Sequence, residues 1–213
     1  MPVNTTHPEY DANLPTWLRA RDVIAGEDSV KAGGEKYLPR LDSQTDDEFA
    51  AYRARALFFN ATCRTAEGYV GLIFRRPPFI KLPEKSSALS KALADFAHDA
   101  DMLGTPFSSY AQNIVGEVIS LGRVGSLVDW EGESENRVYV SRYAAENILN
   151  WRVERINGRN LLTLVVLYEP AGGVVPPEKN TDPFVDVTVE QIRVLKLVPS
   201  DADPVTKRRA CSY

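Results

Sequence analysis

The best candidate for metal chemistry in this sequence is the group Asp95, His98 and Asp99. Spacings of three and four residues place these side chains on one face of a helix, and carboxylate and imidazole groups are common ligands of divalent metals. Leu93 and Phe96 lie on the other side of the same helix. A solvated polar face opposite an apolar one therefore accounts for the group, and we predict no metal site here.

Other catalytic patterns are missing from the sequence. Neither G-x-G-x-x-G nor G-x-x-x-x-G-K-[ST] occurs, and the G-x-S-x-G nucleophile elbow is also absent. Only His7 and His98 could serve as the base of a serine or cysteine triad, and His7 lies in a polar N-terminal stretch that we expect to be an extended arm. The acidic loop with Glu131, Glu133 and Glu135 lacks the ligand spacing of a calcium loop. We therefore predict no enzyme and no cofactor.

Two short basic groups could contact nucleic acid or a neighbouring subunit. They are Arg75-Arg76 and Lys207-Arg208-Arg209. Arg75 and Arg76 lie at the predicted C-terminal end of a helix, where cations bind the last carbonyl groups and oppose the helix dipole. That position explains the pair without a partner, and an interface or nucleic-acid contact is the alternative. Arg75 and Arg76 are the only site candidates that we carry forward.

Composition limits the classes of protein that the chain can belong to. Of 213 residues, 44% are hydrophobic and 25% are charged, as in an ordinary folded protein. The net charge of −4 argues against a protein that grips phosphate backbone, although one that guides nucleic acid without gripping it is compatible. We find no apolar run of membrane-spanning length and no signal peptide. Cys63 and Cys211 form no metal or redox spacing, which favours a reducing compartment.

The strongest periodic signal in the chain is an apolar stripe that predicts one long helix from about residue 46 to 75. Thr45 and Glu48 form a capping box at its start, and Pro77-Pro78 ends it. At 1.5 Å per residue the unbroken helix would be roughly 45 Å long. We expect Phe59→Asp to unfold the domain and Arg76→Ala to leave it folded. The stripe, at spacings of three and four, is Phe49, Tyr52, Ala56, Phe59, Cys63, Ala66, Val70 and Ile73.

The remaining elements change from helical to strand-like along the chain. A short helix is predicted from Leu14-Pro15 to Gly26, and two more cover 86–102 and 106–121. Strands follow, with a hairpin at Asn157-Gly158. The fold class is therefore α+β: N-terminal helices including one long helix, followed by an antiparallel β-rich region. We predict an N-terminal arm with short helices over 1–44, an α+β domain over 45–198 and a loose tail over 199–213.

The order of these segments resembles the N-terminal wing region of a family of tailed-phage portal proteins, formerly catalogued as a domain of unknown function. The likeness runs from about His7 to Leu197. It rests on the order in which the segments follow one another, and none of the segments is a catalytic motif. The segments that carry it are "GYVGLIFRRPPFI" after the long helix, "SSYAQNIVGEVISLGRVGSLVDW" and "AAENILNWRV".

The resemblance implies a structural subunit of a ring, usually of twelve copies, at one vertex of the phage capsid. A terminase motor packages DNA through the central channel, and the DNA later leaves the same way without being tightly bound. Capsid, terminase and head-tail connector proteins are the implied partners, with no membrane. The implied location is the virion, and the host cytoplasm during assembly. Family members continue into a clip, stem and crown, so we expect this chain to be a truncated product, a prophage remnant or a shortened piece.

Three hypotheses remain on the sequence alone. The first is the portal wing module, which predicts self-association and no turnover. The second is a non-enzymatic nucleic-acid-binding or protein-interaction module of phage or prophage origin that uses Arg75, Arg76 and the basic run 207–209. The third is a metal-dependent enzyme centred on Asp95, His98 and Asp99.

Overall fold

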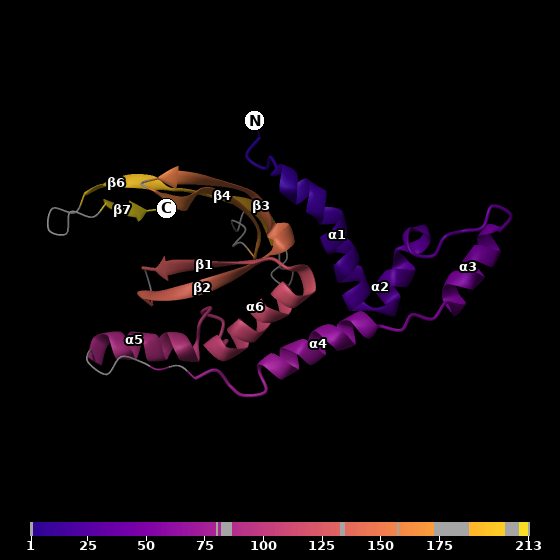
Figure 1. Ribbon diagram of the computed structural model, residues 1–213, viewed down its shortest axis with the longest axis horizontal. Helices are drawn as coiled ribbons and strands as arrows, with labels where there is room; N and C mark the ends of the chain where they lie inside the picture. Colours follow the sequence, from indigo (N-terminus) through magenta and orange to yellow (C-terminus); the bar gives the residue numbers. More distant parts are fainter. Residues whose placement is uncertain are drawn as a thin grey trace, which may run out of the picture. The chain divides into compact units, whose positions relative to one another are not determined.

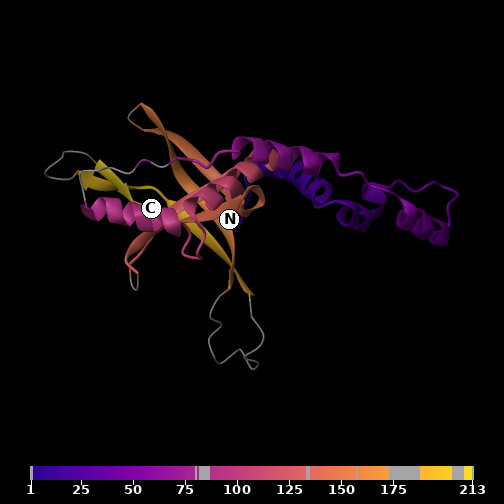
Figure 2. The ribbon, with the colours of Figure 1, turned by 90° about the horizontal axis from the view of Figure 1, so that it is seen from below.

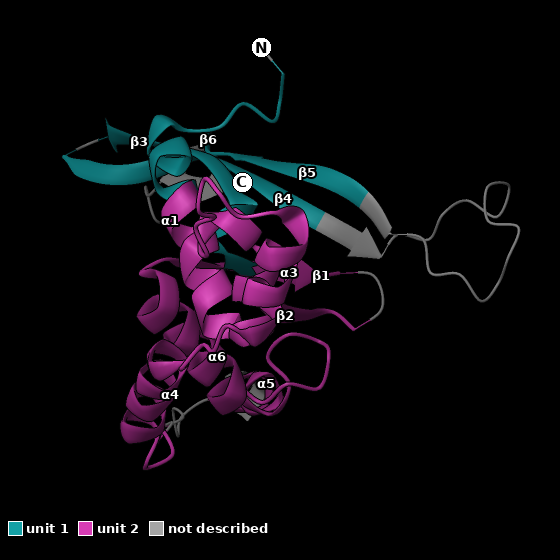
Figure 3. Ribbon diagram, turned by 90° about the vertical axis from the view of Figure 1, so that its right-hand side faces the viewer, with its two compact units in different colours: residues 1–14, 143–213 teal, residues 15–142 magenta. Residues whose placement is uncertain are grey.

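The computed structural model describes residues 2–79, 81, 87–132, 135–156, 158–172, 188–202 and 209–212 (Figure 1). The chain forms two compact units, which are coloured separately in Figure 3. Unit 2 is Pro15–Arg142, and unit 1 combines Met1–Leu14 with Tyr143–Tyr213. Helices dominate the first part of the chain and antiparallel strands the second, so the α+β class is confirmed. The unit borders do not coincide with the domain borders predicted after residues 44 and 198.

The longest helix is α1 (Pro8–Ala25), which begins earlier than the sequence analysis predicted. His7 Nδ1 accepts a hydrogen bond of 3.1 Å from the backbone N–H of Glu9, and Pro8 occupies the first helical position. The expectation that the polar N-terminal stretch is an extended arm is therefore wrong from residue 8 onwards. Pro15 lies inside α1, at the border between the two units.

Unit 2 contains most of the helices and the first hairpin. Figures 1 and 2 show these elements from two directions. The strands β1 and β2 pair with each other, and the last residues of β2 belong to unit 1. In chain order after α1 the elements are α2 (Glu27–Ala32), the 3-10 turn η1 (Gly34–Lys36), α3 (Asp46–Arg55), α4 (Ala61–Ile73), α5 (Ser87–His98), α6 (Phe107–Leu121), β1 (Val124–Glu131) and β2 (Arg137–Ala144).

The core of unit 2 lies between α5, α6 and the β1–β2 hairpin. Ala100, Tyr110 and Val140 are its buried members, and Phe96 and Phe107 pack against them. The backbone N–H of Val140 donates to the carbonyl of Ala100 at 2.9 Å. Apolar burial and this backbone contact together attach the hairpin to the turn between the two helices.

The long helix predicted over residues 46–75 is wrong, because the structure has two helices there. The predicted capping box at Thr45 and Glu48 is present, and α3 ends at Arg55. Residues 56–60 form no helix. Asn60 then begins α4: its Oδ1 accepts from the N–H of Cys63 at 2.9 Å, and its Nδ2 donates to the carbonyl of Ile24 at 2.9 Å. These two hydrogen bonds of Asn60 start a new helix and attach it to α1, although the apolar period of the sequence continues through residues 56–60.

Unit 1 is built on a three-stranded antiparallel sheet in the order β3-β4-β5. Its members are β3 (Ile148–Ile156), β4 (Arg159–Gly172) and β5 (Thr188–Lys196), and the 3-10 turn η2 (Ala145–Asn147) precedes them. Ile156 pairs with Arg159, which confirms the predicted hairpin. Gly158 has a φ of +78°, as such a turn requires, whereas Asn157 lies outside the described residues.

The segment after residue 198 also contains strands. β6 (Val198–Ala202) pairs antiparallel with β7 (Arg209–Ser212). The expectation of a loose tail is therefore wrong for these residues. Backbone pairing needs no apolar period, so the polar sequence gave no signal for it.

The N-terminal segment packs on β3 within unit 1. The His7 ring stacks on Trp151 with 4.0 Å between ring centroids, and the His7 N–H donates to the carbonyl of Leu149 at 2.9 Å. The Tyr10 hydroxyl donates to the carbonyl of Glu146 at 2.9 Å, and Tyr10 is buried. Contacts more than 130 residues apart in sequence thus close this unit.

Candidate interaction surfaces

Arg75 and Arg76 lie in the turn directly after α4. The helix ends at Ile73 with Phe74 as C-cap, and both arginines are exposed. Neither guanidinium has an ion pair within the described part of the chain, so both charges face solvent. Of the second basic group, Lys207 and Arg208 lie outside the described residues and Arg209 begins β7. Arg75 and Arg76 belong to unit 2, and Arg209 belongs to unit 1.

Large apolar side chains are exposed on both sides of the arginine pair. Leu72 and Ile73 precede it and are exposed, and Phe79 follows with 90% of its surface accessible. Soluble monomers seldom expose contiguous apolar patches beyond a few hundred Å². We call the set Leu72, Ile73, Arg75, Arg76 and Phe79 the α4-end surface.

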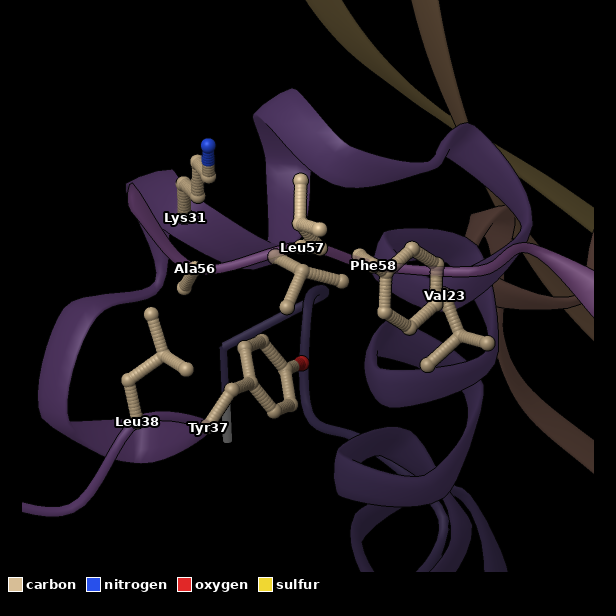
Figure 4. A pocket seen from close by; sticks show the side chains of 8 residues that line it. Val23, Lys31, Tyr37, Leu38, Ala56, Leu57 and Phe58 are labelled. Atoms are coloured by element: carbon tan, nitrogen blue, oxygen red, sulfur yellow. The ribbon is translucent and has the colours of Figure 1, made fainter. Parts of the chain in front are cut away.

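A second group of apolar residues surrounds a pocket at the other end of α4 (Figure 4). The pocket has a volume of about 260 Å³ and an apolar lining, with Leu57 93% exposed at its edge. α1, α2, the segment after η1 and the connection between α3 and α4 all contribute to it. Its apolar lining includes Val23, Val30, Tyr37, Leu38, Leu57 and Phe58.

The polar groups of this pocket are occupied by contacts within the chain. Lys31 Nζ donates to the carbonyl of Ala54 at 3.1 Å and pairs with Glu27 at 2.6 Å. The Tyr37 hydroxyl donates to Asp22, which also accepts from Lys36 Nζ at 2.9 Å. The pocket therefore offers few polar groups to a ligand, and a site of this kind suits an apolar guest.

Asp22 fixes one wall of the pocket. Hydrogen bonds from Tyr37, Lys36 and Ser29 lower the pKa of the Asp22 carboxyl to about 2, from 3.8. The Ser29 hydroxyl donates to Asp22 Oδ1 at 3.0 Å. One carboxylate thus joins α1 to α2 and to the turn that carries Tyr37, and its charged form holds them together.

Acidic residues lie before and in the first turn of α3, and basic residues lie in its last turn. Asp42, Asp46 and Asp47 are all exposed, and Asp46 forms an ion pair with Arg40 at 2.7 Å. Basic residues are closer to the pocket lining in the sequence, because Lys31 is part of it and Arg55 directly precedes Ala56.

The metal candidate is not assembled in the structure. Arg137 Nη2 lies 2.5 Å from Asp99 Oδ2, and the N–H of Gly104 donates to Asp99 Oδ1 at 3.0 Å. Within the described residues, no three His, Cys, Asp or Glu side chains are grouped to hold a metal ion. Asp95 instead lines a pocket of about 560 Å³ between α5 and the β1–β2 hairpin. Lys91 and Trp130 line the same pocket.

The acidic loop after β1 is organised by its own backbone. Glu131 Oε2 accepts from the N–H of Glu135 at 2.6 Å and from the N–H of Asn136 at 3.1 Å. This carboxylate shapes the turn. Glu133 lies outside the described residues.

A charge cluster joins three elements of unit 2. Glu117 on α6 is bound by both Nη atoms of Arg21 from α1, at 3.1 and 2.6 Å. Arg142 from β2 donates to the same carboxylate at 2.9 Å. Arg123 lies over the ring of the buried Trp17 at 5.7 Å. The sequence analysis did not identify this cluster, because its members are distant along the chain.

Comparison with known proteins identifies no relative of this chain. No protein-family model matches the chain, and a search of curated proteins finds no match. None of the helices in the described part of the chain has the length and apolar character needed to cross a membrane.

Sequence reasoning placed the candidate arginines correctly at a helix end but missed the pocket. The missed signal was the run Leu57-Phe58-Phe59 directly before Asn60, a strong helix N-cap. Phe59 is 73% exposed, so the expectation that it supports the core is wrong. Leu57 and Phe58, in the connection between α3 and α4, line the pocket instead.

Proposed function

We propose that this chain is a structural subunit of a phage portal ring, corresponding to its wing portion at the capsid vertex. The observation that supports this most is the exposed apolar surface at both ends of α4. Leu57 and Phe59 lie before the helix, and Leu72, Ile73 and Phe79 lie at or after its end. Burial of such side chains against a neighbouring copy is worth about 1.5–3 kcal/mol each, which favours association.

The succession of sequence segments supports the family assignment, and the charge supports the mode of action. With a net charge of −4, the chain lacks the basic excess of proteins that bind phosphate backbone tightly. In the proposed ring, DNA passes through the channel without firm binding. Capsid, terminase and head-tail connector proteins are the proposed partners, and the virion is the proposed location.

The proposal predicts a defined oligomer of the purified protein. Sedimentation velocity over a hundredfold concentration range should show one species much larger than the 23.7 kDa chain. Class averages from negative-stain electron microscopy should show rotational symmetry. A single species of monomer mass at every concentration would contradict the proposal.

Nucleic-acid binding is the second candidate, and the exposure of Arg75 and Arg76 favours it. Binding to duplex DNA would then weaken steeply with salt, because each phosphate contact releases a counterion. The variant Arg75→Ala/Arg76→Ala should reduce that slope by about two, one for each lost contact. Affinity for DNA that does not change with salt would end this candidate.

A further inference from the structure

We infer that the pocket between α5 and the β1–β2 hairpin binds a small organic cation, a molecule with an apolar or aromatic body and a protonated amine. This inference is independent of the proposed function, because it concerns a single subunit and not its assembly. We call this space, whose lining includes Asp95, Phe96, Trp130 and Val138, the hairpin pocket.

The hairpin pocket has the size of a small-molecule site and lies within unit 2. Figure 1 shows α5 and the hairpin, which form its two sides. Its volume of about 560 Å³ falls within the range of about 300–1,000 Å³ that is usual for ligand sites. Leu93 and Phe96 of α5, with Trp130 and Val138 of the hairpin, supply apolar walls. A flat apolar body can therefore be buried between the helix and the hairpin.

Both sides of the hairpin pocket are held in place by contacts within the chain. Phe96 packs against the core of unit 2. On the hairpin side, Glu131 Oε2 accepts from the N–H groups of Glu135 and Asn136, which fixes the turn that leads into β2. Small-molecule sites are usually preformed in this way, so a ligand needs to order little of the protein.

Polar side chains of the lining remain open to a ligand. Within the described residues, the Asp95 carboxylate, the Asn136 amide and the Trp130 indole N–H have no hydrogen-bond or ion-pair partner. All three residues are exposed, and 55% of the surface of Trp130 is accessible. Apolar walls with a few unoccupied polar groups are the usual composition of a ligand site.

The charges of the lining favour a cation. Arg137 Nη2 lies 2.5 Å from Asp99 Oδ2, and its Nε lies 2.7 Å from Glu135 Oε2, so two carboxylates share one guanidinium and keep a net negative charge. Asp95 adds a carboxylate that is not paired within the described residues. Lys91 lies one helical turn before Asp95, and its long, exposed side chain can turn the ammonium towards solvent, away from a bound cation.

Trp130 adds an aromatic ring that attracts the same kind of ligand. A cation within about 6 Å of an indole ring is attracted by the negative face of the ring, and tryptophan is the strongest side chain of this type. Asp95 comes from α5 and Trp130 from β1, so the amine of one ligand can be bound from both sides of the pocket. A carboxylate in the same place would be repelled by Asp95 and by the face of the ring.

Two probes of the same shape and opposite charge test the inference. Benzylammonium and benzoate are titrated at pH 7 into the ¹⁵N-labelled protein, and NMR follows the indole N–H signal of Trp130, which is assigned with the variant Trp130→Phe. Benzylammonium should shift this signal with a Kd on the order of 1–10 mM, and benzoate should bind at least tenfold more weakly. The indole signals of Trp17 and Trp151, which do not line the pocket, should stay in place.

Substitution of the two charged residues of α5 should change the affinity in opposite directions. Asp95→Asn should weaken benzylammonium binding about threefold, and Lys91→Gln should strengthen it about twofold, because exposed charges interact weakly. Asp47→Asn, an exposed aspartate outside the lining, is the matched control and should leave the affinity unchanged. Circular dichroism establishes that each variant is folded.

Three results would overturn the inference. The first is no shift of the Trp130 signal at a benzylammonium concentration several times the expected Kd. The second is benzoate binding as tightly as benzylammonium, and the third is an unchanged affinity in Asp95→Asn. The oligomeric state of the protein does not enter these outcomes, so the inference and the proposed function can fail separately.

Discussion

At the scale of single residues, burial rather than periodicity decides what a substitution does. Phe59 fits the apolar period of its segment, yet 73% of its surface is exposed, with Arg64 lying over its ring at 5.1 Å. We now expect Phe59→Asp to leave the isolated protein folded and to lower its free energy of unfolding by less than about 1 kcal/mol. Val140→Asp, in the core of unit 2, should unfold that unit. Thermal denaturation of the two variants tests the contrast, and loss of folding in Phe59→Asp would contradict it.

The Asp22 carboxylate gives unit 2 a defined pH dependence. Its pKa is about 2 in the folded protein and 3.8 as the reference value. Because the folded pKa is the lower one, the stabilisation is complete above about pH 4 and is lost as pH falls towards 2. The side chain is 30% exposed, so we expect Asp22→Asn to lower the free energy of unfolding at pH 7 by only about 1–2 kcal/mol.

Urea unfolding at pH 7, 5 and 3 measures this effect. The difference between the parent and Asp22→Asn should hold from pH 7 to 5 and shrink at pH 3. A difference that stays constant over that range would show that the carboxylate charge does not join α1 to α2.

At the scale of elements, Asn60 explains why one predicted helix became two. Its side chain caps α4 through the N–H of Cys63 and also donates to the carbonyl of Ile24 at the end of α1. We expect Asn60→Ala to cost about 1–2 kcal/mol in thermal or urea unfolding. Asn60→Asp keeps the cap acceptor and loses the donor, so it should cost less. Equal losses for both variants would mean that the cap itself contributes little.

Local signals in the sequence predicted most element ends, and long-range contacts explain the failures. The capping box at Thr45 and the glycine turn at Gly158 act through neighbouring residues, so both were predictable. The start of α1 also had a local signal, a proline at the first helical position directly after His7. Sequence analysis missed it because the segment is polar and has no apolar period. The contact of Asn60 with Ile24 depends on the folded chain and has no local sign.

At the scale of the whole molecule, the sequence predicted the fold class, with helices in the first part of the chain and antiparallel strands in the second. It could not predict the candidate surfaces. The pocket combines residues from α1, α2 and the connection before α4, which are brought together only by folding. Exposure of Phe79 and Leu57 likewise depends on where α4 begins and ends.

The central claim is that the chain assembles through surfaces at the two ends of α4. Sedimentation velocity of the parent protein and of Phe79→Ser, over a hundredfold range of concentration, tests it most directly. The account predicts an oligomer for the parent and weaker association for Phe79→Ser, which removes the most exposed apolar side chain after α4. A parent protein of monomer mass at every concentration would contradict it.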